Sequence, residues 1–455
     1  MGPAKWETIC RRITTSSLVE FSRDDPTPPL PKAWVPKWKK RSRPPGPAPF
    51  RNPKNWSAVE EMKSTSQTGG RVPELDGLRG LAILLVVFYH YIYGGFSLQD
   101  QSLPARFTHT VFSLAWSGVD LFFVLSGFLI GGMLMACRTT ENYFATFYIR
   151  RFCRILPLYL LWLALFVLFS HVFLPRPPPD WYSTVFLREI PHFRPWEYFV
   201  FLQNFYIAKS GLYGSSWLAA TWSLAVEEQF YLLLPLIIWC VPPRRLPTVL
   251  VSLILLVPAL RISLYLFRPE LTIYVLLPCR ADSLLLGVLC ACFVRNDNLL
   301  GWLQGARDWL YFTLAVLLLG FGCLTLFGAR QGNPKLFASF EMASFGYSWV
   351  AAFYACLLLI VVTDKTGVIG AMMRLSWLRH FGLIAYGVFL MHMAVNNLVH
   401  GLLLRKESVC FDNFAAVMAT LLALLVTWLL AVISWNFLEK PIINWGHSFL
   451  YSGKR

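Results

Sequence analysis

The sequence predicts an all-α, polytopic integral membrane protein with about ten transmembrane helices, and three observations support this fold class. Of the 455 residues, 56% are hydrophobic and only 15% are charged, a balance unusual for a soluble globular protein. The apolar residues fall into runs of about 20, the length that a helix needs to cross a bilayer. Lys and Arg gather at the ends of these runs, where membrane topology places them.

The hydrophobic runs predict ten spans. A further apolar stretch, Trp196–Ala208, is too short to cross and is expected at the membrane interface. The cations of the short loops favour an orientation with both termini inside (N-in/C-in). The expected spans are 78–96, 111–136, 155–174, 217–240, 247–267, 272–294, 309–327, 347–363, 381–403 and 414–437.

The chain divides into three expected parts. Residues 1–75 are basic and Pro-rich, and they predict a disordered tail without a signal peptide. This tail either contacts anionic lipid through Lys37–Arg43, or the natural protein starts at Met62; the sequence leaves both open. Residues 76–445 form the expected membrane domain, and residues 446–455 a short cytosolic tail.

The net charge of +16 does not indicate a nucleic-acid partner, because most of the cations lie in the tail and at span ends. The ten cysteines are scattered, mostly within apolar runs. The closest pair, Cys290 and Cys292, lacks metal-ligand spacing, so we expect reduced packing residues, no disulfide framework and no metal site.

The first span begins with Arg79 and carries His90 eleven residues later. Eleven residues make about three helical turns, so both side chains share one face and stand roughly 16 Å apart along the axis. A cation at the surface and an imidazole at mid-depth could hold two ends of one long ligand. An Arg anchor and a His bonded to a neighbouring helix are the structural alternatives.

A second group of cations, Arg150, Arg151 and Arg154, lies at the expected inner start of the third span. Guanidinium groups match phosphate oxygens in two-point geometry, which favours a phosphate-bearing cytosolic ligand. Topological anchoring is the alternative.

Other spans carry ionisable residues that a purely structural helix would avoid. Adjacent Glu227 and Glu228 point about 100° apart, so both cannot face one target; one could orient an imidazole, and the other could pair with Arg261 or Arg280. Mutual neutralisation is expected for Arg280 and Asp282, with the lining of an acceptor path second. Small residues at 126, 127, 131 and 132 indicate close helix packing, and they follow Asp120 in the second span. His392 is a second buried imidazole, with helix cross-bonding and catalysis as alternatives.

Together these segments resemble the membrane-bound acyltransferase-3 family, which O-acylates sugars and some natural products. The resemblance covers about residues 73–445, with the motifs in the family's order, and the SGNH domain fused in some members is not expected in this chain. The matching segments are Arg79-x10-His90, Phe122-Phe-Val-Leu-Ser-Gly-Phe-Leu-Ile130, Arg151-x-x-Arg154, Trp222-Ser-Leu-Ala-Val-Glu-Glu-Gln-Phe-Tyr231, Arg280-x-Asp282, Tyr386–His392 and Glu439-Lys-Pro441.

This resemblance implies a catalytic role for His90, as the base that takes the proton of the acceptor hydroxyl during attack on the thioester of acyl-CoA. It implies that Arg79, Arg151 and Arg154 bind the phosphates of the donor. Glu227 is placed beside the catalytic His90. Residues expected to line the acceptor side are Asp120, Arg280, Asp282 and His392.

We therefore expect an O-acyltransferase that moves an acyl group, most simply acetyl from acetyl-CoA, directly to a hydroxyl of an envelope carbohydrate or related acceptor. The expected location is a plasma membrane or bacterial inner membrane. A secondary transporter or channel with charged residues along its path is the alternative function, and an inactive scaffold is a third. Neither the acyl chain length nor the oligomeric state follows from the sequence.

Overall fold

The computed structural model describes residues 72–96, 102–112, 114–172, 177–187, 195–268, 271–330, 339–406 and 409–453. The predicted tail therefore lies outside the described residues, apart from its last four. Helix α3 begins at Pro73, three residues before the expected boundary of the membrane domain. Proline suits the first turn of a helix, and Glu74 and Asp76 there interact favourably with the positive end of the helix dipole.

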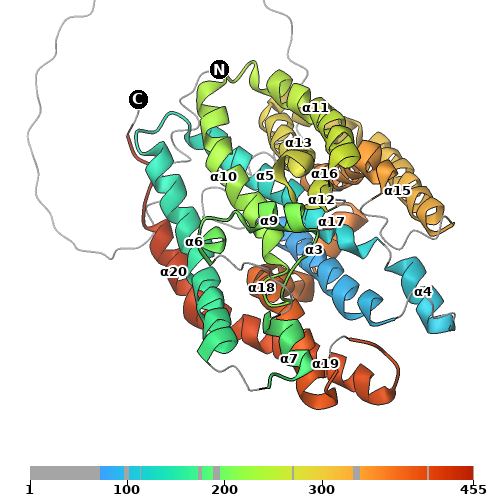
Figure 1. Cartoon of the computed structure of the whole chain (residues 1–455). Helices are drawn as coiled ribbons and strands as arrows, with labels where there is room; N and C mark the ends of the chain where they lie inside the picture. The colour runs from blue at the N-terminus through green and yellow to red at the C-terminus, as the bar shows by residue number, and fades with distance from the viewer. Residues whose placement is uncertain are drawn as a thin grey trace, which may run out of the picture. The chain divides into compact units, whose positions relative to one another are not determined.

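Ten helices of the described chain are long and apolar enough to cross a membrane, which confirms the predicted number of spans (Figure 1). The described residues contain no strand, so the protein is an all-α, multi-pass integral membrane protein. The long helices are α3 (Pro73–Tyr91), α5 (Gly118–Cys137), α6 (Tyr143–Val167), α10 (Thr221–Cys240), α11 (Leu246–Phe267), α13 (Leu277–Arg295), α15 (Arg307–Arg330), α16 (Tyr347–Thr363), α18 (Ser376–Leu404) and α19 (Phe414–Ser434).

Shorter helices connect the long ones. Two of them, α8 and α9, occupy most of the expected interfacial stretch, and Phe201 between them adopts a left-handed conformation with φ of 56°. The short helices are α4 (Leu103–Val111), α7 (Asp180–Tyr182), α8 (Pro195–Phe199), α9 (Gln203–Ser210), α12 (Thr272–Val275), α14 (Asp297–Gly305), α17 (Val368–Met373) and α20 (Lys440–His447).

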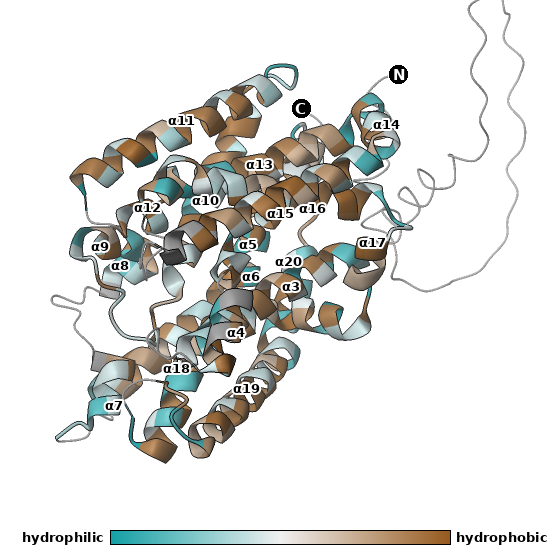
Figure 2. Cartoon of the chain, turned by 90° about the vertical axis from the view of Figure 1, so that its right-hand side faces the viewer, coloured by the Kyte–Doolittle hydropathy of each residue, from teal (hydrophilic) through white to brown (hydrophobic). Residues whose placement is uncertain are grey.

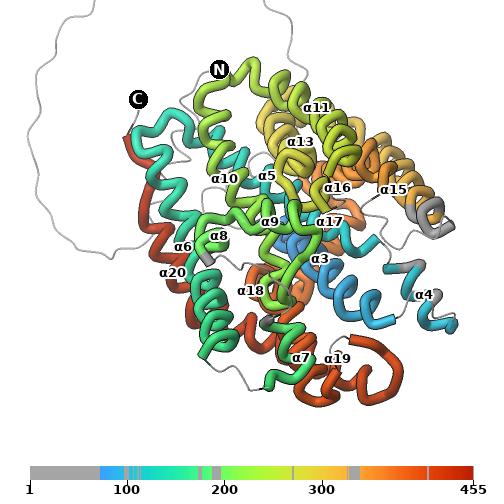
Figure 3. Tube along the Cα trace, viewed as in Figure 1, coloured from blue at the N-terminus to red at the C-terminus, as the bar shows by residue number. Residues whose placement is uncertain are grey.

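Helix α6 begins at Tyr143, well before the predicted start of the third span at residue 155. The additional turns pack against the C-terminal segment, whose helix α20 runs beside α6 (Figure 3). Arg150 Nε donates a hydrogen bond of 2.9 Å to the carbonyl of Phe449, and Asn142 Nδ2 donates one of 2.7 Å to that of Leu450. The predicted C-terminal tail is thus docked on α6 over most of its length.

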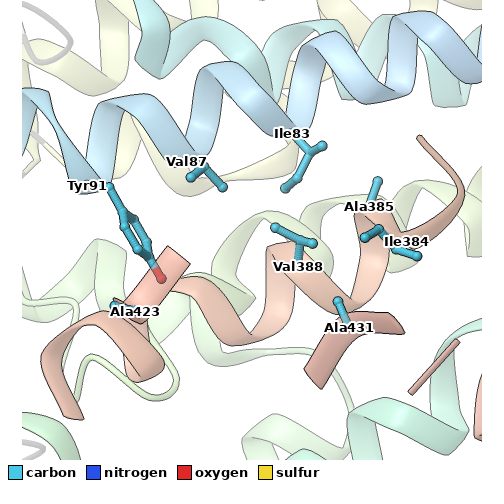
Figure 4. Packing of buried hydrophobic residues seen from close by; sticks show 8 residues of the cluster. All are labelled: Ile83, Val87, Tyr91, Ile384, Ala385, Val388, Ala423 and Ala431. Atoms are coloured by element: carbon cyan, nitrogen blue, oxygen red, sulfur yellow. The ribbon is translucent and has the colours of Figure 1, made fainter. Parts of the chain in front are cut away.

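Helices α3 and α18 run parallel and in direct backbone contact. A Cβ atom on Gly80 would lie 1.9 Å from the carbonyl oxygen of Leu378, so only glycine fits there. Further along, Tyr91 donates a hydrogen bond of 2.8 Å to the carbonyl of His392. Apolar side chains fill the space between α3, α18 and α19 (Figure 4), namely Ile83, Val87, Tyr91, Ile384, Ala385, Val388, Ala423 and Ala431.

Helices α5 and α13 form a second close pair, as the small residues of the second span predicted. A Cβ atom on Gly127 would lie 1.9 Å from the carbonyl oxygen of Leu284, and one on Gly287 would lie 2.0 Å from that of Val124. The prediction of close packing at this segment is therefore confirmed.

Other helices present apolar side chains outward, as a bilayer requires. Leu255 on α11 and Leu319 on α15 are each 71% exposed, and both helices are strongly hydrophobic along their length (Figure 2). These outer surfaces match the hydrocarbon layer, and the polar residues that concern function lie between the inner helices.

Candidate active site

Two cavities lie among the inner helices and share three lining residues. The basic cavity encloses about 150 Å³ and contains all three residues predicted to bind the donor, Arg79, Arg151 and Arg154. Two carboxylates, Glu227 and Glu439, also line it, so guanidinium groups outnumber carboxylates. The structure thus brings together three cations that are separated by up to 75 positions in the sequence, and their shared cavity is suited to an anionic group.

The side chains of the basic cavity are positioned by hydrogen bonds. Arg79 Nη1 lies 2.7 Å from Asp76 Oδ1, one turn earlier on α3. Glu227 accepts a hydrogen bond of 3.0 Å from the hydroxyl of Ser126 and one of 3.2 Å from that of Tyr231. The guanidinium of Arg151 lies over the ring of Tyr231 at 5.7 Å, and its buried Nε has no hydrogen-bond partner among the described residues. A buried guanidinium nitrogen without an acceptor fits a site that binds an anion.

The second cavity, the histidine cavity, encloses about 410 Å³ and contains His90 and His392. None of the described residues that line it is Lys, Arg, Asp or Glu. Its surface is instead mainly aromatic, with amides and hydroxyl groups between the rings. The aromatic and amide residues are Tyr89, Trp116, Tyr213, Trp222, Tyr274, Phe389, Asn396 and Asn397.

The two imidazoles contact each other directly. His90 Nδ1 lies 3.3 Å from His392 Nε2, and the ring centroids are 4.9 Å apart. His90 Nδ1 is also 2.9 Å from the carbonyl of Val86, and His392 Nδ1 is 2.7 Å from that of Phe389. His392 therefore bonds to a neighbouring helix, which was one of the two expected alternatives; its role in catalysis stays a prediction.

The two cavities meet at Val119, Ser223 and Phe389, which line both of them. Arg79 and His90, on one face of α3, line different cavities on either side of this junction. A long, narrow ligand that passed the junction would place its anionic end near Arg79 and its other end near His90.

Glu227 does not occupy the environment expected for it. The sequence interpretation placed it beside His90, but its carboxylate lines the basic cavity and bonds Ser126 and Tyr231 instead. The adjacent Glu228 lines neither cavity, because successive helical residues point about 100° apart.

Asp120, Arg280 and Asp282 were expected to line the acceptor side, and they line neither cavity. Arg280 Nη2 lies 2.5 Å from Asp120 Oδ1, and Arg261 Nη1 lies 2.7 Å from Asp282 Oδ2, with all four side chains fully buried. The expected neutralisation of Arg280 by Asp282 was wrong, as was the pairing of Arg261 or Arg280 with a glutamate. Each cation instead pairs with a carboxylate of another helix, Asp282 of α13 for Arg261 of α11 and Asp120 of α5 for Arg280 of α13.

Several residues of the two cavities were not singled out as site residues in the sequence. Ser126 was interpreted as a small packing residue, and Tyr231 carried no role, although its spacing of four from Glu227 places both on one helix face. Asn396 is 3% exposed, lines the histidine cavity, and has an Oδ1 atom without a hydrogen-bond partner among the described residues. Asn396 follows His392 by four residues, and this spacing, which places both on one helix face, could have identified it from the sequence.

Residues 72–436 match the family model described as an acyltransferase domain, that of the acyltransferase-3 family. Peptidoglycan O-acetyltransferase OatA of Listeria monocytogenes is 27% identical over 407 residues, which cover 86% of this chain and 59% of that protein. Putative peptidoglycan O-acetyltransferase YrhL of Bacillus subtilis is 27% identical over 402 residues, which cover 82% and 55%. O-acetyltransferase OatA of Staphylococcus aureus is 25% identical over 407 residues, which cover 86% and 59%.

The chain thus spans less than two thirds of the length of these curated relatives. No solved structure matches it. The family model covers well over half of the chain and includes both cavities apart from Glu439 and Ile443. The resemblance found in the sequence is therefore confirmed, and this chain belongs to the acyltransferase-3 family of membrane proteins.

Proposed function

We propose that this protein is an O-acyltransferase that moves an acetyl group from cytosolic acetyl-CoA to a hydroxyl of an envelope carbohydrate on the other side of the membrane. The observation that carries the proposal is the junction of the two cavities, one basic and one containing the histidine pair. The relatives' printed names, which specify O-acetyl transfer and in two cases peptidoglycan, support the same reaction.

The basic cavity supports an anionic donor. Arg79, Arg151 and Arg154 line it, and guanidinium groups bind phosphate oxygens in two-point geometry. Its volume of about 150 Å³ is below the roughly 300–1,000 Å³ of a pocket for a drug-sized ligand. We therefore place the diphosphate and the adjoining end of the narrow arm of CoA here, with the adenosine at the cytosolic surface.

The histidine cavity supports an uncharged, hydroxyl-bearing acceptor. Tyr89, Trp116 and Trp222 offer flat apolar surfaces, and Asn396 offers an amide oxygen that lacks a partner within the described chain. Burial raises the pKa of Tyr213, in the segment before α10, well above its usual range, so its phenol remains a neutral donor. A neutral sugar ring satisfies both the aromatic and the hydrogen-bonding groups.

In the proposed reaction, His90 Nε2 takes the proton from the acceptor hydroxyl as its oxygen attacks the thioester carbonyl. The carbon–sulfur bond breaks as the ester forms, and the departing sulfur takes the proton from His90, so that free CoA leaves. An imidazole suits this step, since its ordinary pKa of about 6.5 leaves it largely neutral near pH 7.

Binding of radiolabelled CoA to the purified protein tests the donor. We expect Arg151→Gln and Arg154→Gln each to weaken binding about tenfold or more, because a charge-assisted hydrogen bond contributes about 1.5–3 kcal/mol. The control is Arg244→Gln, which removes an exposed cation that lines neither cavity. Equal CoA affinity in all four proteins would contradict the donor site.

Transfer from radiolabelled acetyl-CoA to an envelope glycan extract tests the reaction. We expect label in an alkali-labile glycan product with wild-type membranes and a loss of about 10²–10⁴-fold with His90→Ala, the range that general base catalysis contributes. Equal labelling with both proteins would remove His90 from catalysis. CoA binding by a wild-type protein that labels no glycan, sugar or small product would contradict the proposed transfer.

A further inference from the structure

We propose that His392 is the positioning residue of this site, and that its Nε2 lone pair accepts the Nδ1 hydrogen of His90 and stabilises the imidazolium that forms when His90 takes the acceptor proton. This inference rests on the proposed function. It assigns to a second imidazole the task that an aspartate performs in many base-catalysed acyl transfers.

The hydrogen-bond partners assign the protons of both neutral rings. A carbonyl oxygen can only accept, so His392 Nδ1, at 2.7 Å from the carbonyl of Phe389, carries a proton. The neutral ring has one N–H, and His392 Nε2 is therefore an acceptor. By the same reasoning His90 Nδ1, at 2.9 Å from the carbonyl of Val86, is protonated.

The 3.3 Å contact between the rings follows from these assignments. His90 Nδ1 donates, with its hydrogen shared between the carbonyl of Val86 and the Nε2 atom of His392. The lone pair of His90 is consequently on Nε2, the nitrogen that the proposed reaction needs. Only this arrangement of neutral tautomers satisfies all three contacts.

The surroundings leave the stabilising role to His392. No Asp or Glu is among the described residues that line the histidine cavity. Glu227 lines the basic cavity, where its carboxylate accepts hydrogen bonds from Ser126 and Tyr231. Tyr89 contacts His90 through a ring edge, with centroids 5.2 Å apart, and carries no charge near neutral pH. When His90 gains a proton, the lone pair of His392 is therefore the side-chain acceptor that faces its Nδ1–H, beside the backbone carbonyl of Val86.

The framework holds His392 in place for this role. His392 is 1% exposed, and its backbone carbonyl accepts a hydrogen bond of 2.8 Å from the hydroxyl of Tyr91. Tyr91 in turn lies 2.8 Å from the hydroxyl of Thr427, so α3, α18 and α19 are joined at the level of the two histidines.

Two conservative substitutions separate this role from a merely structural one. His392→Asn keeps an amide N–H near the position of Nδ1, where it can donate to the carbonyl of Phe389, but it places no acceptor near His90. His392→Gln extends an amide oxygen to about the position of Nε2, where it can accept from His90. A structural role would favour Asn, and the proposed role favours Gln.

The experiment measures the maximal rate of label transfer from radiolabelled acetyl-CoA to envelope glycan extract, using purified full-length protein. We expect His392→Asn to lower this rate by about 10- to 100-fold, a large part of what a general base contributes, and His392→Gln to stay within about tenfold of wild type. The half-saturating acetyl-CoA concentration should remain unchanged in both. The matched control is His400→Gln, two turns further on α18, whose Nε2 bonds Thr420 and which lines neither cavity.

Size-exclusion elution verifies that each variant is folded. The inference is overturned if folded His392→Asn transfers as fast as wild type, or if folded Gln and Asn variants lose equal activity. Failure of the proposed function gives a different result, because wild-type protein itself would then transfer no label.

Discussion

At the scale of single residues, the cationic and the imidazole side chains of the site lie in different cavities. Arg79, Arg151 and Arg154 face the basic cavity, whereas His90 and His392 face a cavity lined by neutral groups. Burial of an unpaired charge costs much free energy, whereas burial of a neutral, hydrogen-bonded imidazole costs far less. The base of the proposed reaction can therefore lie deep in the membrane without a permanent counter-charge.

Asn396 gives a prediction about the acceptor. Its Oδ1 atom has no hydrogen-bond partner within the described residues, and the residue lines the cavity that contains His90. We expect Asn396→Ala to raise the amount of glycan extract needed for half-maximal labelling by about 2- to 10-fold, the effect of one lost hydrogen bond of 0.5–1.5 kcal/mol. The half-saturating acetyl-CoA concentration should not change. Exposed Asn436→Ala is the control, and an effect on the donor alone would contradict an acceptor contact.

The buried ion pairs give a second prediction at this scale. Asp120→Asn removes the negative partner of fully buried Arg280, so we expect about 3–5 kcal/mol of destabilisation, measured as a lower unfolding temperature in detergent. Protein that remains folded should need the same amount of acceptor. Asp308→Asn breaks an exposed pair with Arg307 and should change stability by less than about 1 kcal/mol. A normal unfolding temperature with a raised acceptor requirement would restore Asp120 to the acceptor site.

At the scale of helices, glycines decide which elements can approach each other. Gly80 and Gly382 join α3 to α18, and Gly127 and Gly287 join α5 to α13. Association of helices in a membrane depends on close packing, because lipid tails are as apolar as the side chains they replace. The α3–α18 contact is the one that brings His90 and His392 together.

Two glycines on α5 test this packing. Gly127→Ala would place a Cβ 1.9 Å from a backbone oxygen of α13, so we expect about 1–3 kcal/mol of destabilisation or more from the forced separation. Gly132→Ala, five residues further, would place its Cβ 3.8 Å from Ala291, an ordinary contact, and should leave stability nearly unchanged or slightly improved. Unfolding temperatures of the two variants in one detergent provide the comparison. Equal temperatures would show that α5 and α13 are free to separate.

At the scale of the whole membrane domain, parallel packing of α3 with α18 and of α5 with α13 agrees with ten alternating spans. In each pair, matching contacts advance in the same direction along both helices. In the order of spans, α3 is the first and α18 the ninth, and α5 is the second and α13 the sixth, so an odd number of spans lies between the members of each pair, as parallel orientation requires. The absolute orientation, N-in/C-in, stays a prediction.

Native cysteines test that orientation. Exposed Cys240 ends α10, and half-buried Cys410 lies between α18 and α19, so the prediction places the first inside and the second outside. We expect a membrane-impermeant maleimide to label Cys410 in right-side-out vesicles and Cys240 in inverted ones. Cys410→Ser and Cys240→Ser variants identify each signal. The reverse pattern would place the basic cavity on the outer side and contradict a cytosolic donor.

The sequence alone determined the fold class, the number of spans and the family, and it singled out Arg79 and His90 as candidate site residues. Apolar runs of bilayer length and the spacing from Arg79 to His90 are local properties, so they can be read without knowing which helices touch. Small residues near Gly127 likewise indicated close packing before the partner helix was known.

Only the tertiary structure decided which of these side chains contact each other. His392 contacts His90 from 302 positions later in the sequence. Arg280 pairs with Asp120 and not with Asp282. Glu227 lines the cavity of the arginines and not that of His90. Each of these contacts depends on which helices pack together and at what rotation, and a change of 100° per residue alters what a side chain faces. The charge and spacing of residues in the sequence restrict which side chains can form a site, but the packing of helices such as α3 and α18 determines which of them meet.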